Sequence, residues 1–288
     1  MNTARTKAAT PARKPRRAST STPDKPKFRT IWISDVHLGT VGCKADHLVD
    51  FLKAHECETL YLVGDIIDGW KLKNHFYWPQ EHTNVIRKIL TKSKRGTKVY
   101  YVTGNHDEFL RKFVGFQLSL GNIQVVNEHI HTTADGRQLL ITHGDAFDVI
   151  TRYHAWVAMA GDAAYEATLR FNYWFNRGRR TLGMRYWSLS AFAKQRVKAA
   201  VNVVSTFEES VARECQRRGM DGVVCGHIHH AEIAERQGVT YHNCGDWVES
   251  CTALVEDFNG QIRILRWVEL DHLNQRSDDK VMPIRVGT

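Results

Sequence analysis

The chain has 288 residues, which is enough for one large domain or for one domain with a sizeable insertion. Its hydrophobic fraction of 42% is enough to fill a core. The chain contains no run of about 18 apolar residues, so the sequence does not predict a membrane-spanning helix. The net charge of +9 is concentrated in residues 1–27, where eight basic residues face the single acid Asp24. The near-neutral remainder disfavours a broad nucleic-acid footprint.

Residues 1–27 predict a disordered basic tail, because four of the six prolines lie there and Phe28 is the first aromatic residue. The tail lacks the apolar core of a signal peptide. It is either a solvated leader or an electrostatic tether to anionic lipid. Nucleic-acid contact is the weakest of the three interpretations. The six cysteines show no C-x-x-C spacing, which favours a reduced, cytoplasmic setting.

Strand-like and helical patterns alternate along the chain, which indicates an α/β fold. In the first half, strand-like runs at 31–34, 60–64 and 99–104 alternate with helical patterns at 45–54 and 83–93. An aromatic stretch at 69–79, containing Phe76 and Tyr77, is expected to be a loop. Further strand-like runs follow at 139–142, 223–226, 239–243, 252–255 and 262–267.

Residues 148–218 have a different composition, with helical spacing and many aromatic and basic side chains. We expect a helical cap inserted into a domain formed by 28–147 and 219–270, with a loose tail at 271–288. Most of the aromatic residues would pack on one another. Within this segment the best candidate site for binding phosphate is formed by Arg177, Arg179 and Arg180, because guanidinium groups match the geometry of phosphate.

Five of the strand-like runs are followed directly by residues that ligate metals. The five clusters are Asp35 with His37, Asp65 with Asp68, Asn105 with His106 and Asp107, His143, and His227 with His229. Residues at the carboxyl ends of neighbouring buried strands converge in space. A lone histidine is usually structural, but five such clusters in one chain predict a metal cage.

Hydrolysis of phosphate esters is a reaction that a cage of this kind can catalyse. Two cations about 3.5–4 Å apart neutralise the anionic ester and activate water for an in-line displacement. Such a centre needs a carboxylate shared by both ions, and Asp65 is the candidate bridge.

The same motifs, in the same order and spacing over residues 28–267, resemble the signature of calcineurin-like metallophosphoesterases. The resemblance implies a four-layer α-β-β-α sandwich. It also implies a first metal held by Asp35, His37, Asp65 and His229, and a second held by Asp65, Asn105, His143 and His227. Mn²⁺ suits this mixture of carboxylate, amide and imidazole best, with Fe or Zn²⁺ as alternatives.

The resemblance also implies roles beside the metals. His106 would lie at the scissile phosphate as a stabiliser or proton donor, oriented by Asp107, and Asp68 would support the ligands. Three further residues are candidates for substrate contact. Trp70 and Trp78, together with Phe76 and Tyr77, would form an aromatic wall at the rim that meets acyl chains or a quaternary ammonium headgroup, with loop packing as the alternative. Asp246 would contact a headgroup.

Within the superfamily the chain is similar to a lipid-directed bacterial group, which includes UDP-2,3-diacylglucosamine pyrophosphatases and phospholipase C-type enzymes. The pyrophosphatases typically carry Arg where this chain has His106, and a histidine can also protonate an alkoxide leaving group. We therefore expect removal of a phospholipid headgroup at the inner face of a bacterial membrane, with peripheral contact to anionic lipid. The alternatives are the pyrophosphatase activity and, third, a nuclease or nucleotide phosphodiesterase. A non-catalytic scaffold is disfavoured because every ligand position is intact.

Overall fold

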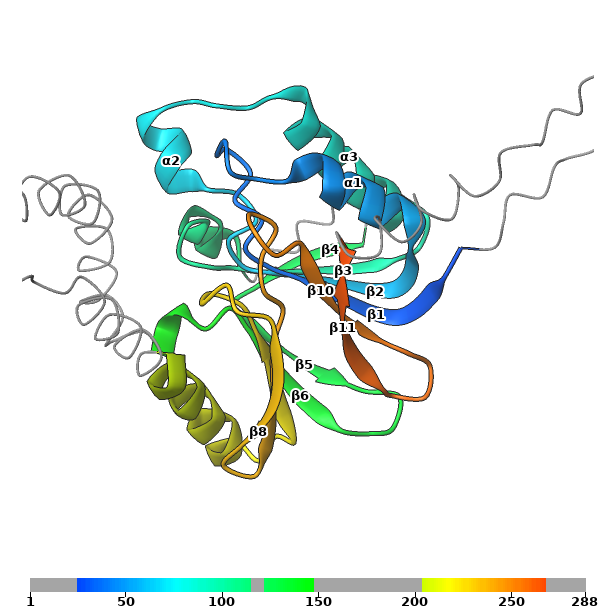
Figure 1. Cartoon of the computed structure of the whole chain (residues 1–288), viewed down its shortest axis with the longest axis vertical. Coiled ribbons are helices and arrows are strands. Elements are labelled where there is room, and N and C mark those ends of the chain that lie inside the picture. Colours follow the sequence, from blue (N-terminus) through cyan, green and yellow to red (C-terminus); the bar gives the residue numbers. More distant parts are fainter. Residues whose placement is uncertain (1–24, 115–121, 148–203, 268–288) are drawn as a thin grey trace, which may run out of the picture.

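Two β-sheets lie face to face and are covered by helices on their outer sides (Figure 1). The computed structural model describes residues 25–114, 122–147 and 204–267. The expected cap, most of the basic tail and the C-terminal tail therefore lie outside the described residues. Within the described ranges, no helix is long and apolar enough to cross a membrane.

The first sheet has the strand order β11-β10-β1-β2-β3-β4. Strands β1 to β4 run parallel, whereas β10 is antiparallel to β1 and β11 is antiparallel to β10. The bounds are β1 Lys27–Ile33, β2 Glu56–Val63, β3 Lys98–Val102, β4 Ile123–Val126, β10 Thr252–Glu256 and β11 Ile262–Arg266.

The second sheet has the strand order β5-β6-β7-β9-β8. Strands β6, β7 and β9 run parallel, and β5 and β8 pair antiparallel at the two edges. The bounds are β5 Glu128–Thr132, β6 Gln138–Thr142, β7 Gly222–Cys225, β8 Glu232–Arg236 and β9 Val239–Asn243.

The central strands are apolar on both faces because both faces are buried. In β1, Ile31 and Ile33 pack toward the helices, whereas Trp32 points into the layer between the sheets. In β2, Leu60 packs toward the helices and Tyr61 stacks on Trp32 with a centroid distance of 5.9 Å. A third core lies beneath a helix at residues 204–217 on the outer face of the second sheet. The four-layer α-β-β-α arrangement expected from the resemblance is confirmed.

Helices α1 (Ala45–Ala54) and α3 (Gln80–Lys94) cover the outer face of the first sheet. The expected loop after Asp68 instead begins with a short helix, α2 (Gly69–Asn74), in which Asp68 accepts a hydrogen bond from Lys71 N at 2.8 Å. Two short 3₁₀ helices, η1 (Glu108–Phe113) and η2 (Asp145–Phe147), follow β3 and β6.

A buried carboxylate links the two sheets at the end opposite the metal-ligand motifs. Glu256 is fully buried and accepts hydrogen bonds from Arg29 at 2.7 and 2.9 Å and from Thr30 Oγ1 at 2.7 Å. From the second sheet, His131 Nε2 lies 2.9 Å from Glu256 and Ala134 N donates to it at 2.7 Å. We call these five residues the inter-sheet clamp.

Candidate metal centre

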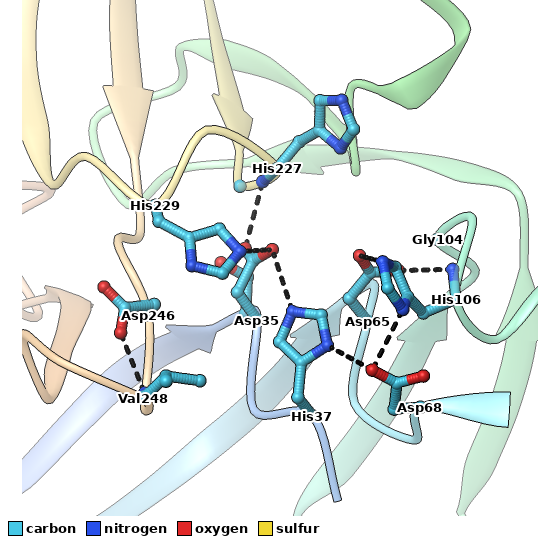
Figure 2. Close-up of polar contacts among 12 residues, drawn as sticks. Asp35, His37, Asp65, Asp68, Gly104, His106, His227, His229, Asp246 and Val248 are labelled. Carbon is cyan, nitrogen blue, oxygen red and sulfur yellow. Dashed lines mark hydrogen bonds and ion pairs between the residues drawn. The ribbon is translucent and has the colours of Figure 1, made fainter. Parts of the chain in front are cut away.

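The metal-ligand motifs of both sheets meet at one edge of the sandwich. Asp35, Asp65 and Asn105 follow parallel strands β1, β2 and β3 of the first sheet. His143 and His227 follow parallel strands β6 and β7 of the second sheet. Figure 2 shows side chains from both sheets pointing into the same space. The site therefore exists only where the two sheets pack together.

Three groups of three side chains bring their ligand atoms to within 4.8 Å of one another, and the third of them, His37, Asp68 and His106, shares His37 with the first. The first group is Asp35, His37 and His229, and the second is Asp65, His143 and His227. These are the same residues that the family resemblance divides between two metal ions. The first two groups therefore contain six of the seven candidate ligands, and Asn105, the seventh, follows β3 at the same edge of the sandwich.

Several ligand atoms are buried without a hydrogen-bond partner. They are Asp35 Oδ1, His37 Nε2, Asn105 Oδ1 and His143 Nε2. Their neighbours are other ligand atoms, since His229 Nε2 lies 3.2 Å from Asp35 Oδ1 and His143 Nε2 lies 3.2 Å from Asp65 Oδ2. Leaving a buried polar atom unpaired costs about 1–3 kcal/mol. The carboxylate, amide and imidazole set fits a pair of divalent cations, which would satisfy these atoms.

The backbone at these positions is also unusual. Seven non-glycine residues in the described ranges have positive φ, and five of them are candidate ligands. The φ values are 51° at Asp35, 52° at His37, 53° at Asp65, 71° at His227 and 56° at His229. Such conformations are costly for residues with a Cβ, and they cluster at functional sites. They turn each side chain back toward the centre directly after its strand.

The clusters carry a strong negative field. Burial opposes ionisation of Asp35, but the ion pair with His229 and the charges of His143 and His37 outweigh it and lower the pKa of Asp35 well below its usual range. Burial likewise opposes a charged His143, yet the adjacent Asp65 raises the pKa of His143 to about 10. A bound divalent cation would meet the same negative charge, and His143 would then ligate it as a neutral imidazole.

His106 is held by Asp68 rather than by Asp107, which corrects the expected orienting residue. His106 Nδ1 lies 3.0 Å from Asp68 Oδ2, and the same oxygen lies 3.1 Å from His37 Nδ1 (Figure 2). Asp107 instead accepts hydrogen bonds from the backbone of Ile66 and Gly104 and from Tyr101 Oη, all within 2.9 Å. Its carboxylate is fully used in fixing the loop that carries Asn105 and His106.

The three substrate-contact candidates in the described ranges lie in different surroundings. Trp70 is 46% exposed and packs against His106 in a tilted arrangement with a centroid distance of 4.2 Å, so it lies at the rim of the site. Trp78 packs away from the ligand clusters, where its Nε1 donates to Thr83 Oγ1 at 3.1 Å. The segment with Arg177, Arg179 and Arg180 lies outside the described residues.

Asp246 does not offer its carboxylate to a ligand. It is 1% exposed, and its Oδ1 accepts from the backbone N–H groups of Val248 and Glu249 at 2.8 and 2.5 Å. Its Oδ2 accepts from Ser250 Oγ at 2.7 Å. The expected headgroup contact is therefore wrong, because the loop itself uses the whole carboxylate.

A glycine next to Asn105 allows the two sheets to approach closely. A Cβ built on Gly104 would lie 2.6 Å from Asp65 N and 2.9 Å from His143 Cδ2, and it would also meet the Asp65 carboxylate. We expect Gly104→Ala to displace these ligands and to lower kcat/KM by about 10²-fold, as misplacement of about 1 Å does in enzymes. Steady-state kinetics and bound-metal analysis would measure this.

Gly42→Ala is the matched control, because its added Cβ would meet one flexible side-chain atom, Val248 Cγ1, at 3.1 Å. Gly104→Ala with unchanged kinetics and metal content would contradict the assigned packing.

Comparison with known proteins agrees with this geometry. The family model for calcineurin-like phosphoesterases matches residues 28–231, and the chain belongs to this family. The chain is 23% identical over 233 residues to UDP-2,3-diacylglucosamine hydrolase of Psychromonas ingrahamii, covering 76% of this chain and 90% of that protein. It is 24% identical over 258 residues to the Haemophilus influenzae protein of the same name, with coverages of 82% and 98%.

Solved structures with similar folds include an archaeal phosphodiesterase, with a TM-score of 0.40, 14% identity and coverages of 82% of this chain and 98% of that one. A single mutant of Vps29 from Entamoeba histolytica has a TM-score of 0.40, 13% identity and coverages of 82% and 97%. Family membership and the curated relatives make the protein a metal-dependent hydrolase of phosphoric esters or anhydrides, with relatives in a lipid-directed bacterial branch.

Proposed function

We propose that the protein is a dinuclear-metal hydrolase that cleaves a phosphorus–oxygen bond in a lipid-linked phosphate. The observation that carries the proposal is the pair of ligand clusters, in which Asp35 Oδ1, His37 Nε2 and His143 Nε2 are buried without a hydrogen-bond partner. The family uses a dinuclear metal centre. Two Mn²⁺ ions suit the oxygen and nitrogen ligands best, and they would supply charge neutralisation and an activated water.

The protein's own side chains divide the remaining work. Asp65 would be the shared carboxylate that the family resemblance assigns to it. One of its oxygens lies 3.2 Å from His143 Nε2 of the second cluster, and the other accepts a hydrogen bond from His106 N at 2.8 Å. His106 is 23% exposed at the mouth of the site. Asp68 Oδ2 lies 3.0 Å from its Nδ1, which leaves Nε2 as the atom that would stabilise or protonate a leaving oxygen.

The relatives favour a pyrophosphate substrate over the phospholipid diester that the sequence suggested first. Both relatives named above carry the name UDP-2,3-diacylglucosamine hydrolase. We therefore place hydrolysis of a UDP-linked diacylglucosamine first. Phospholipase C-type cleavage is the second candidate, supported by the Asp68–His106 pair, since a held imidazole suits an alkoxide leaving group. A lipid-linked substrate would place the reaction at the inner face of a bacterial membrane.

Mass spectrometry of the products would separate the two candidates. Purified protein with Mn²⁺ should convert the UDP-linked lipid into UMP and a lipid phosphate if the first candidate is right. Release of diacylglycerol and a phosphorylated headgroup from phospholipids would establish the second. Hydrolysis of DNA or cyclic nucleotides, with no action on either lipid, would contradict both.

The Asp68–His106 pair predicts non-additive kinetics. We expect Asp68→Asn and His106→Asn each to lower kcat by about 10²-fold. Asp68→Asn would remove the carboxylate that positions the His106 imidazole, and His106→Asn would remove the imidazole itself. The double variant should then be little worse than either single variant. Kinetics at saturating Mn²⁺ would measure this, and fully additive losses would show that Asp68 does not act through His106.

Asp107→Asn is the matched comparison for this pair. Its three hydrogen bonds hold the loop, so we expect a lower unfolding temperature instead of the same loss in kcat.

The choice at position 106 predicts a shift in substrate preference. If the protein cleaves a diester, His106→Arg should abolish proton donation and lower diester turnover by about 10²-fold. Pyrophosphate hydrolysis should change far less, because its leaving group is already a stable anion. Competition between the two substrates in one reaction would measure the ratio directly, and equal losses on both would contradict a leaving-group role.

A further inference from the structure

Four exposed aromatic side chains lie on or next to two short helices, α2 and η1, that contact each other beside His106. Among the nine large hydrophobic side chains that are exposed in the described ranges, Trp70 (46%), Phe76 (76%), Phe109 (42%) and Phe113 (36%) lie on or next to α2 and η1. The remaining exposed hydrophobic side chains are distributed over other elements. Burying a phenylalanine is favourable, so a cluster of this kind in water marks an interaction surface.

Helices α2 and η1 form one continuous surface. Gly69 N donates to His106 O at 2.9 Å, and Trp70 Nε1 donates to Glu108 Oε1 at 3.3 Å. A Cβ on Gly69 would lie 2.8 Å from the Phe109 ring, which shows how closely the two helices approach. The two elements are therefore fixed relative to each other and can bind as one unit.

The charge of this surface is basic. Lys71, Lys73, Arg111 and Lys112 are exposed, and Glu108 is the single acid in residues 69–76 and 108–114. Arg111 is paired with Asp145 at 2.6 Å, so within the described ranges the three lysines provide the unpaired positive charge of this surface. Lys112 Nζ lies 5.4 Å from the centroid of the Phe113 ring, so a cation and an aromatic ring stand side by side. We define the α2–η1 face as Trp70, Phe76, Phe109, Phe113, Lys71, Lys73, Arg111 and Lys112.

We propose that the α2–η1 face docks on the surface of an anionic lipid bilayer. Aromatic rings are stable at the boundary between headgroups and acyl chains, and lysines extend their ammonium groups to lipid phosphates. Because Trp70 packs against His106, docking presents the catalytic side of the metal centre to the lipid. The proposed lipid-linked substrate gives this docking its purpose, but the docking does not depend on hydrolysis.

Vesicle sedimentation with the full-length protein tests the proposal. Phosphatidylcholine vesicles with and without phosphatidylglycerol are used, and neither contains a substrate. We expect Phe109→Ser with Phe113→Ser to weaken partitioning onto the mixed vesicles by about tenfold or more. Lys71→Gln with Lys73→Gln should weaken it by about fivefold per charge, and only on the anionic vesicles.

A matched variant carries Leu90→Ser and Phe258→Ser, two exposed hydrophobic residues on α3 and in the β10–β11 hairpin. It should bind vesicles like the wild type. All three variants should hydrolyse a small water-soluble phosphodiester at the wild-type rate, which shows that the fold is intact.

Three results would overturn the docking proposal. The first is that the Phe109/Phe113 variant partitions onto vesicles as strongly as the wild type, which would mean that the basic N-terminal tail accounts for the binding. The second is an equal loss in the Leu90/Phe258 variant. The third is a wild-type dimer that this phenylalanine pair alone disrupts, which would make the face an interface between copies. None of these readouts depends on whether a lipid is hydrolysed, so failure of docking is distinct from failure of the proposed function.

Discussion

Asp65→Asn is expected to lower phosphoester hydrolysis by at least about 10³-fold, equivalent to roughly 4 kcal/mol of transition-state stabilisation. Asp65 belongs to the second cluster and is the proposed bridge to the first, so its change to an amide removes a negative charge that both proposed ions would use. The variant should also retain fewer metal ions. Steady-state kinetics and elemental analysis after purification in Mn²⁺ would measure the two effects together.

The control for this prediction is Asp50→Asn, an exposed aspartate on α1 whose contact is Lys53 at 2.9 Å. It should retain wild-type kinetics and metal content. If Asp65→Asn kept full activity with two metals bound, the bridging role of Asp65 would be refuted.

Glu256→Gln is expected to lower the free energy of unfolding by about 3 kcal/mol, because removing one partner leaves the partly buried Arg29 guanidinium poorly compensated. For a domain of this size the unfolding temperature should fall by roughly 6–12 °C. Since the inter-sheet clamp lies at the far end of the sandwich, metal content should be unchanged. Differential scanning calorimetry would measure the shift.

Glu58→Gln is the matched control, because its contact with Lys27 at 3.4 Å is exposed and should contribute little. Burial favours the neutral form of Glu256, but hydrogen bonds from His131, Thr30 and Ala134 hold its pKa below the ordinary value of 4.5. Its stabilisation is therefore present above about pH 4.5 and is lost as pH falls through the lowered pKa. A variant as stable as the wild type at pH 7 would contradict the clamp.

The strands that carry the site were readable because they are parallel and buried on both faces. Continuous apolar runs predicted β1, β2, β3, β6 and β7, and the polar residues after them marked the edge where the ligands meet. Strands β4, β5 and β8 were missed. They lie at sheet edges or are only partly buried, as the Glu128–Thr132 strand shows, so polar residues interrupt their pattern.

Residue spacing could not show which carboxylates are already occupied by hydrogen bonds. Asp107 is adjacent to His106 in sequence, but it points to backbone N–H groups, and Asp68 reaches the imidazole from another loop. Asp246 follows a strand and a glycine as the candidate ligands do, yet its carboxylate accepts hydrogen bonds within its own turn. The α2 helix was not predicted because Asp68 was interpreted as part of the metal motif and not as the residue that caps a helix.

The left-handed backbone at His227 and His229 lowers the stability of the protein, but the proposed activity requires the histidine side chains at these positions. A glycine would adopt φ values of 71° and 56° at little cost, so His229→Gly would relieve a penalty of about 1 kcal/mol. The same change would delete a ligand. Selection for thermal tolerance alone would therefore tend to erode the centre, and directed evolution of a more robust version should hold these positions constant while it searches the rest of the sandwich.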